Sequence, residues 1–484
     1  MPDNGRYRRK PKKKGIPGLV PVIIIFLCTV LIIGGLELFY FKDNGEGEKP
    51  TRPTADTEVT TEPTTEPTEP PIEKIATATI SSTGDLLMHL PVINSGKSAD
   101  GTYDFTDLFR KVAPYVQKAD YAVANLETTL YGERNGKKFS GYPAFNCPDE
   151  IVDGAKDAGF DMLLTANNHS NDTGYDGIAR TLEVIDERGL DRLGFVKDDT
   201  EKKYLVKDIN GIKVGMLCYT YETDDTPGKV ALNGIPLNST ATGMVNAFAY
   251  GELDTFYNTV SRQLADMKAD GAEATILYIH WGVEYLLAPN SSQKTIAQKL
   301  CDLGVDVIVG GHPHVVEPVE LLTSTVDESH KTVCLYSMGN AVSNQRRGNS
   351  KLFPAAGNTE DGVLFSVTFA KYSDGTVLLE NTEALPLWVN VYSGNSGKVY
   401  EILPLDNSVT DWKTALSISD SAETEARASY TRTMKLVEQG VTDSQTYLDS
   451  IIKPDSEEYK LLLESTAVPE ETVQQQVLPD AGNP

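Results

Sequence analysis

The residues best suited to chemistry in this sequence stand just after short, β-branched apolar runs. The run "VDVIVGG" leads into His312 and His314, and "ATILYI" leads into His280. Three earlier runs, "IATATIS", "YAVANL" and "FDMLLTA", lead in the same way to acidic, amide or histidine residues. In chain order, the residues of interest at the five runs are Asp85, His89, Asn125, Glu127, Asn168, His169, Asp172, His280, Glu284, His312 and His314. They include five of the six histidines of the chain, and only His330 lies elsewhere.

Imidazole, carboxylate and amide groups together suit a divalent transition metal such as Zn²⁺, Mn²⁺ or Fe²⁺. Ca²⁺ and Mg²⁺ sites, by contrast, are built from oxygen ligands alone. The candidates outnumber the ligands of one tetrahedral site, so we expect two metal ions that share a carboxylate. Two ions about 3.5–4 Å apart can activate water and stabilise both oxygens of an in-line displacement at phosphorus.

Taken singly, several of these residues have ordinary structural explanations. One histidine at a strand end usually has a structural role, and the stretch from Asn125 to Glu127 could form a simple turn. The His-x-His pair after two glycines is more specific. In an extended chain, residues i and i+2 lie on the same face. His312 and His314 can therefore both point to one centre if the turn after the two glycines directs that face toward it. The joint pattern over five runs therefore favours a metal site.

The runs alternate with amphipathic stretches such as "YDGIARTLEVIDERG" and "SQKTIAQKLCDLG". This alternation predicts an α/β domain with a largely parallel or mixed sheet over residues 75–405. Residues 361–405 alternate at a period of two, which indicates antiparallel strands that close the domain. In open α/β sheets, ligands bind beyond the carboxyl ends of the strands, so the five runs should deliver their polar residues to one rim. Residues 406–484 form a polar carboxyl-terminal extension, expected to be helical near 423–440.

The amino-terminal part predicts a membrane anchor. Residues 15–36 contain no charged residue, and a helix of that length rises about 33 Å, enough to cross a bilayer. We assign residues 1–14 to a basic cytoplasmic segment, 15–41 to a single transmembrane anchor and 42–74 to a disordered, Thr/Glu/Pro-rich stalk. The alternative, a cleaved signal peptide, is disfavoured because the apolar run is long and no small-residue cleavage site follows it. The folded part is therefore expected to be extracellular.

The charge of the chain excludes one class of partner. The formal net charge is −25, and residues 1–42 hold eight basic residues against two acidic ones, so the remainder is more acidic still. Such a body repels nucleic acid, and we expect no nucleic-acid partner. The partner that the uncharged run of residues 15–36 predicts is the membrane.

Six motifs carry a family resemblance. The stretches "TGDLLMH", "NLETTL", "ANNHSNDTG", "HWGVEY", "GGHPHVVEP" and "YSMGN" resemble, in order and spacing, those of the CapA family of bacterial poly-γ-glutamate capsule proteins. That family is similar to calcineurin-like metallophosphoesterases, and the resemblance covers residues 76–345. It implies a four-layer α-β-β-α sandwich of metallophosphoesterase type, with a metal site at one edge of the sheets.

The resemblance also implies roles for single residues. Asp85 and His314 would bind a first metal, Glu127 would bridge two metals, and the second metal would be bound by Asn168, His280 and His312. His169 would face the substrate, while Asp172 and Glu284 would orient ligand histidines; His89 and Asn125 are further metal candidates. The sequence departs from the metallophosphoesterase pattern at Leu87, where a histidine usually stands, at Asn125-Leu-Glu127 and at Asn167. A site with a single ion therefore remains an alternative.

Together these features predict a membrane-anchored extracellular protein with a metal-dependent, phosphoesterase-like site. It would act in synthesis, export or attachment of a capsule polymer such as poly-γ-glutamate. A close variant is a hydrolase that cuts envelope phosphoesters or γ-glutamyl bonds. The alternative from another class is a non-catalytic, metal-binding scaffold of a capsule synthase or export complex. A surface adhesin would account for the stalk but not for the histidines.

Overall fold

A computed structural model describes residues 72–224, 229–395 and 397–451 of the chain. The predicted cytoplasmic segment and anchor, and almost all of the predicted stalk, lie outside these residues. None of the helices within the described ranges has both the length and the apolar character needed to cross a membrane.

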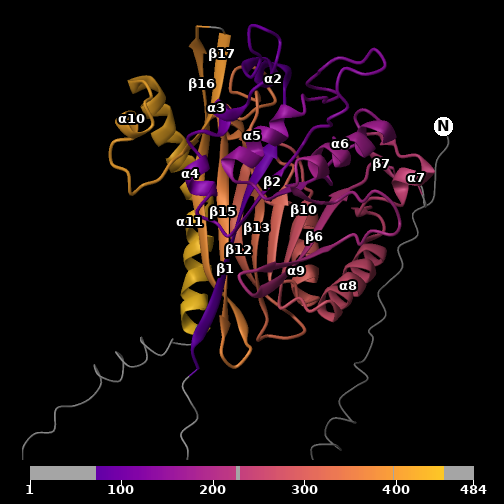
Figure 1. The fold of residues 1–484 in the computed structure, drawn as a ribbon. Coiled ribbons are helices and arrows are strands. Elements are labelled where there is room, and N and C mark those ends of the chain that lie inside the picture. The colour runs from indigo at the N-terminus through magenta and orange to yellow at the C-terminus, as the bar shows by residue number, and fades with distance from the viewer. Residues whose placement is uncertain (1–71, 225–228, 396, 452–484) are drawn as a thin grey trace, which may run out of the picture. The chain divides into compact units, whose positions relative to one another are not determined.

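The first of two large sheets contains the chain's amino- and carboxyl-terminal strands (Figure 1). Its order is β17-β16-β15-β1-β2-β3-β4, and β14 pairs in parallel with the end of β1. The strands β1 to β4 are parallel, whereas β15, β16 and β17 are antiparallel, as the period-two pattern of residues 361–405 predicts. The strands are β1 (Lys74–Leu86), β2 (Tyr121–Asn125), β3 (Met162–Leu164), β4 (Asp191–Leu193), β14 (Asn340–Val342), β15 (Asp361–Tyr372), β16 (Val377–Gly394) and β17 (Gly397–Pro404).

The second sheet has the order β12-β13-β11-β10-β6-β5, and the short β9 pairs with the end of β6. Its central strands β6, β10, β11 and β13 are parallel, and the edges β5 and β12 are antiparallel to their neighbours. The strands are β5 (Leu205–Ile209), β6 (Ile212–Tyr221), β9 (Ala247–Phe248), β10 (Ala274–His280), β11 (Val307–Gly311), β12 (Val316–Thr323) and β13 (Lys331–Met338). A separate hairpin joins β7 (Ala231–Leu232) to β8 (Ile235–Pro236).

The two sheets pack face to face, because successive side chains of each central strand enter different apolar layers. In β10, Ile276 and Tyr278 enter a core shared with β1, β2 and β15 of the other sheet, whereas Leu277 and Ile279 pack outward. Burial on both faces explains why the central parallel strands read as nearly continuous apolar runs. The hydroxyl groups of Tyr278 and Ser82 are 2.9 Å apart and connect the two sheets across this core.

Helices cover both outer faces and complete an α-β-β-α order of layers. The first sheet is covered by α2 (Leu90–Ser95), α3 (Thr106–Phe109), α4 (Ala113–Val116) and α5 (Glu150–Ala158), and the second by α8 (Leu253–Ala269) and α9 (Ser291–Asp302). The predicted α/β sandwich is thereby confirmed. The remaining helices are α6 (Tyr175–Glu187), α7 (Ser239–Thr242), the 3-10 turn η1 (Asn358–Glu360), α10 (Trp412–Ala415) and α11 (Asp420–Ile451).

The long helix α11 packs against strands of both sheets, β15 and β16 of the first sheet and β12 of the second (Figure 1). Its Gly440 lies directly on the backbone of β12, where an added Cβ would come within 1.8 Å of the Val319 carbonyl oxygen. Arg432 and Ser429 of the helix both donate hydrogen bonds to the buried carboxylate of Asp361 at the start of β15. Residues 420–451 are therefore packed into the same compact unit as the two sheets.

Candidate metal centre

The candidate residues gather where the parallel strands of both sheets end. Asp85 lies near the end of β1, Glu127 follows β2 by two residues, and Asn168 follows β3 in the same sheet. His280 is the last residue of β10, and His312 immediately follows β11 in the other sheet. Because the parallel strands of each sheet present their carboxyl ends at one rim, the packing of the two sheets brings both rims to a common centre.

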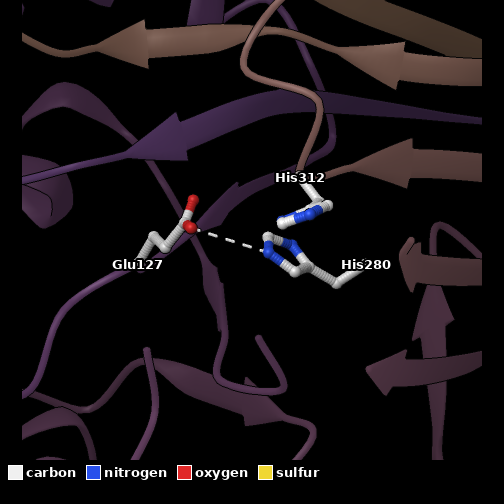
Figure 2. A group of neighbouring side chains, drawn as sticks. All are labelled: Glu127, His280 and His312. Atoms are coloured by element: carbon white, nitrogen blue, oxygen red, sulfur yellow. Dashed lines mark ion pairs between the residues drawn. The ribbon is translucent and has the colours of Figure 1, made fainter. Parts of the chain in front are cut away.

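Two groups of side chains in this centre have a geometry that could hold a metal ion. Figure 2 shows the first, in which Glu127 faces His280 and His312, and the second consists of Asp85, Glu127 and His314. In each group one ligand atom from every residue lies within 4.8 Å of the others. Glu127 Oε1 is 3.6 Å from His280 Nε2 and 3.9 Å from His314 Nε2. Glu127 therefore belongs to both groups, at the place where a bridging ligand would stand.

Left-handed backbone conformations aim the two neighbouring histidines into the centre. His312 has a φ of 97° and His314 a φ of 57°, a region that residues other than glycine adopt rarely. A turn of this kind after β11 brings both rings to the cluster, with ring centres 6.0 Å apart. Strained backbone of this kind costs about 1–3 kcal/mol per residue and persists mainly where surrounding structure enforces it, often at functional sites.

Asparagine side chains hold the carboxylate and one imidazole of the centre in place. Asn125 donates to Asp85 Oδ1 at 2.7 Å, and Asn167 in turn donates to the Asn125 side-chain oxygen at 3.1 Å. Asn168 Oδ1 lies 2.9 Å from His280 Nε2, so this amide oxygen borders the first group. In the structure Asn125 orients Asp85, whereas Asn168 is placed beside the candidate ligands.

A further asparagine, Asn340 in β14, acts together with Asp85 to determine which nitrogen of His314 carries the proton. The Asn340 Nδ2 group donates to the backbone carbonyls of Thr359 and His314, at 2.9 and 3.2 Å, so its Oδ1 must point the other way. That oxygen lies 3.1 Å from His314 Nδ1, and Asp85 Oδ2 lies 3.0 Å from the same nitrogen. Between two acceptors, Nδ1 must be the donor. The unprotonated Nε2 of His314 is then the nitrogen on the side of Glu127.

Burial sets the charges of the centre. Burial lowers the pKa of His280 to about 3 and that of His312 well below its usual value, so both rings are neutral near pH 7 and able to bind a metal. Burial, and then the nearby charge of Asp85, raise the pKa of Glu127 well above its usual range. For Asp85 burial also acts to raise the pKa, but the hydrogen bonds from His314 and Asn125 act in the opposite direction and the pKa is lowered.

Unsatisfied polar atoms show that the centre fits a cation. Among the described residues, both carboxylate oxygens of Glu127 and Nδ1 of His312 are buried without a hydrogen-bond partner. A buried, unpartnered polar group costs about 1–3 kcal/mol, and more when it is charged, and such groups call for an explanation. Their donor types, a carboxylate and neutral imidazoles, are those that Zn²⁺, Mn²⁺ and Fe²⁺ prefer. Divalent cations held by the two groups would give these atoms partners.

His169 stands beside the centre and faces a cavity. Its Nδ1 lies 2.8 Å from Asp172 Oδ2, and the same carboxylate oxygen accepts the Phe145 backbone N–H at 2.7 Å. The Phe145 ring packs edge-on against the His169 ring, with centres 4.6 Å apart. His169 lines a cavity of about 390 Å³ together with His89 and His314. Asp172 thus orients His169, and the remaining nitrogen of His169 is available to a bound molecule.

Three other histidine and acidic positions lie outside the two metal groups. His89 is half-buried in the cavity wall, and burial lowers its pKa to about 4. Glu284 is exposed and lines the cavity beside Tyr285, rather than contacting His280. His330 lies apart, with its Nε2 3.1 Å from the carbonyl oxygen of Val305.

Reasoning from sequence did not assign a role to Asn340, to Phe145 or to the loop of residues 344–353. Asn340 carries the same signal as the other site residues, because it directly follows an apolar run and a glycine in "YSMGN". Phe145 and residues 344–353 give no comparable signal, since they come from irregular segments whose position depends on the folded chain.

The chain matches a family model and two curated proteins. The model of the bacterial capsule synthesis protein PGA_cap matches residues 79–345. The capsule biosynthesis protein CapA of Bacillus anthracis is 28% identical over 277 residues, and the PGA biosynthesis protein CapA of Bacillus subtilis strain 168 is 30% identical over 269 residues. Each alignment covers 55% of this chain, and the chain spans 60% and 63% of the lengths of these relatives.

Among solved structures, the NAD nucleotidase NadN of Haemophilus influenzae aligns with a TM-score of 0.40 and 12% identity, over 78% of this chain and 68% of its own. The sulfate thiohydrolase SoxB of Thermus thermophilus aligns with a TM-score of 0.31 and 13% identity, over 68% of this chain and 46% of its own. Scores of this size do not establish a shared fold. The family model, in contrast, covers more than half of the chain and includes every candidate residue of the centre. The chain therefore belongs to the PGA_cap family of bacterial capsule synthesis proteins, the CapA family.

Proposed function

We propose that this protein is a metal-dependent hydrolase with phosphoesterase-like chemistry, which acts in the synthesis, export or attachment of a capsule polymer such as poly-γ-glutamate. Membership of the capsule synthesis family supports the biological role. The observation that carries the chemical proposal is the position of Glu127, shared by two histidine-containing groups with both of its oxygens buried and unpartnered. Two divalent ions, Mn²⁺, Fe²⁺ or Zn²⁺, would fit this arrangement.

The side chains around the centre would have different roles in hydrolysis. Bound divalent cations supply Lewis acidity, which polarises a phosphoryl oxygen and makes water a stronger nucleophile. Glu127, His280, His312 and His314 hold the reacting centre in a buried setting where electrostatic interactions are strong. As the water oxygen bonds to phosphorus and the ester P–O bond breaks, His169 gives a proton to the leaving oxygen. Asp172 keeps the His169 ring oriented for this transfer.

The test is metal-dependent turnover by the full chain on a panel of phosphoesters and γ-glutamyl peptides. We expect phosphoester hydrolysis with Mn²⁺, Fe²⁺ or Zn²⁺ and its loss after chelation. His169→Ala should lower kcat by about 10²–10⁴-fold, the usual contribution of general acid–base catalysis, with metal content unchanged. His330→Ala is the matched control, because His330 lies outside the centre. Complete absence of metal-dependent turnover by the parent chain would contradict the enzyme proposal and favour the scaffold alternative.

We further propose that residues 15–41 anchor the protein in the membrane, with residues 1–14 in the cytoplasm and the folded body outside the cell. The uncharged run of residues 15–36 and the basic residues before it support this topology. The test introduces a cysteine as Asn4→Cys in one variant and as Thr60→Cys in another, and treats intact cells with a membrane-impermeant maleimide. The topology predicts labelling at position 60 only, and labelling at position 4 would contradict it.

A further inference from the structure

The cavity beside the metal centre is lined in part by histidines and in part by apolar side chains. His89, His169 and His314 face it from the side of the centre. The other lining residues include the aromatic and aliphatic side chains of Tyr142, Phe145, Tyr285, Leu352 and Phe353, of which Phe145 packs against His169. Its volume of about 390 Å³ falls in the range of pockets that enclose a small organic group.

The mouth of this cavity exposes large apolar side chains to an unusual degree. Among the described residues, only three large apolar side chains are more than 70% exposed: Tyr142 at 76%, Leu352 at 75% and Val326 at 72%. Two of the three, Tyr142 and Leu352, line this cavity. The loop that carries Tyr285 adds the exposed Val283, Leu286 and Leu287. Clustered exposed apolar surface at a concave site marks a place where an apolar partner or ligand is covered from water.

The polar groups of the cavity are mostly uncharged. Asn344, Gln345, Asn349 and Ser350 line it, and no lysine or arginine is found among the described lining residues. The arginines that follow in sequence, Arg346 and Arg347, are engaged by the buried carboxylate of Glu360. The charged carboxyl group in the wall is that of Glu284. A carboxylate-bearing group in this part of the cavity would be repelled by Glu284, and the exposed Lys351 of the neighbouring loop segment is not among the lining residues.

We propose that this cavity is a substrate subsite for an uncharged, apolar group, so that the substrate is a phosphate ester of an apolar alcohol. This rests on the proposed phosphoesterase function. The phosphate end lies at the metal centre, and the alcohol part occupies the cavity between Phe145, Tyr285, Leu352 and Phe353. Hydrolysis adds the oxygen of water to phosphorus, breaks the P–O bond to the alcohol and returns the alcohol with one proton, leaving inorganic phosphate. An anionic polymer chain is not the group that enters.

The test compares matched esters with the metal-loaded full chain. Octyl phosphate, propyl phosphate and the phosphate ester of 8-hydroxyoctanoic acid differ only in apolar length or in a terminal carboxylate, and kcat/KM is measured for each by phosphate release. We expect octyl phosphate to exceed both others by about tenfold or more, since each buried methylene contributes about 0.8 kcal/mol. Equal or higher values for the carboxylate-bearing ester would overturn the proposal.

Two substitutions at the mouth test the subsite itself. Leu352→Asp and Tyr142→Asp should each raise the KM for octyl phosphate about fivefold or more and change that for propyl phosphate little. Val326→Asp is the matched control, because Val326 is as exposed but lies in the turn between β12 and β13. Such exposed positions tolerate the change without loss of folding. If all three substitutions have an equal effect on KM, or if none has an effect, the proposed subsite is contradicted.

A binding measurement separates this proposal from the proposed activity. Octyl phosphate is titrated calorimetrically into the metal-loaded His169→Ala protein, which keeps the cavity mouth. Binding that weakens in the Leu352→Asp background and persists in the Val326→Asp background supports the subsite even if turnover is not found, whereas absence of binding overturns it. A last arm presents dodecyl phosphate in phosphatidylcholine vesicles. Turnover there as well as in solution identifies a membrane-held ester as the source, and turnover of the free ester alone identifies a soluble one.

Discussion

Two buried carboxylates stand side by side in the candidate centre and are stabilised in different ways. Asp85 accepts hydrogen bonds from Asn125 and His314, and its pKa is lowered in spite of burial. Glu127 accepts none within the described structure, and its pKa is raised by burial and by the charge of Asp85. The protein itself therefore supports the charge on Asp85, whereas a cation is needed to support the charge on Glu127.

Glu127→Gln should reduce metal binding without destabilising the metal-free protein. A raised carboxyl pKa in the folded state means that this group stabilises the fold fully only below its usual pKa, and that the contribution is lost as pH rises. At pH 8 the neutral glutamine avoids that loss. We expect the metal content from elemental analysis to fall by at least one equivalent, and the melting temperature of the chelated protein to stay equal or rise. Retention of full metal content would contradict the bridging position.

Asn340→Leu should weaken the preference of the His314 proton for Nδ1, because one of its two acceptors is removed. The substitution removes the acceptor at 3.1 Å from Nδ1 and leaves only Asp85 on that side. Nitrogen-15 spectra of histidine-labelled, metal-free protein should show one Nδ1-protonated tautomer for His314 in the parent and a mixture in the variant. Asn349→Leu, in the cavity wall, is the control. A pure Nε2-protonated tautomer in the parent would refute the assignment.

At the scale of elements, helix α11 and strand β12 are in close backbone contact at one residue, Gly440. Gly440 in the middle of a helix costs about 1 kcal/mol in helix propensity relative to alanine. Its presence is explained by the β12 backbone, which leaves no space for a Cβ. Close contact with β12 thus outweighs helix propensity at this position.

Gly440→Ala should therefore destabilise the protein, although it improves helix propensity. An overpacked contact costs about 1–3 kcal/mol, and here the contact is to backbone, which yields little. Urea denaturation should show a lower midpoint for the variant. Gly251→Ala makes the same change where an added Cβ meets nothing within 4 Å, and it should leave the midpoint unchanged. A higher midpoint for Gly440→Ala would show that α11 does not lie against β12.

A buried acid connects β12 to the start of α9 and should make stability depend on pH. Glu317 Oε2 accepts a hydrogen bond from Gln293 at 2.6 Å, and Gln293 together with Asn290 caps α9. Burial raises the pKa of Glu317 to about 7, against an ordinary value of 4.5. The stability that this group contributes is complete below pH 4.5 and is lost as pH rises through 7.

Replacing Glu317 with glutamine should flatten that pH dependence. The shift corresponds to at most about 3 kcal/mol, at about 1.4 kcal/mol for each pKa unit. The free energy of unfolding, measured for metal-free protein at pH 5 and pH 8, should fall less between these values in Glu317→Gln than in the parent. Glu320→Gln, three residues along the same strand and exposed, serves as the control. An unchanged slope would mean that Glu317 is not the titrating group.

At the scale of the whole molecule, the centre joins strand ends from both sheets, so a bound cation would cross-link the two halves of the sandwich. Anything that binds only the folded state stabilises it by mass action, by about 2.7 kcal/mol at a ligand concentration of 100 times Kd. The metal and the fold should therefore be thermodynamically coupled.

Chelation should lower the melting temperature of the parent, and Mn²⁺ or Zn²⁺ should restore it. For a protein of this size a change of about 2–3 kcal/mol corresponds to several degrees. His280→Ala and His312→Ala should reduce the difference between metal-loaded and chelated samples in thermal scans, and His330→Ala should preserve it. A chelator-insensitive melting temperature in the parent would contradict metal binding at the sheet junction.

The sequence by itself determined the alternating strands and helices and the polar residues that end them. Strand periodicity decides which side chains are buried, and parallel strands necessarily present their carboxyl ends together. Asp85, Glu127, Asn168, His280, His312 and His314 could therefore be assigned to one centre from local patterns and the family resemblance. The structure places all of them there.

Only the tertiary structure decided how those residues face one another. The orientation of His312 and His314 depends on left-handed backbone that the packed rim enforces. The position of the His314 proton depends on Asp85 and Asn340, which are 229 and 26 residues away in sequence. The cavity needs Tyr142, Tyr285 and Leu352 from three separate loops. Loop positions follow from contacts between distant segments, which no local periodicity encodes, and for that reason the substrate-facing surface could not be predicted from the sequence.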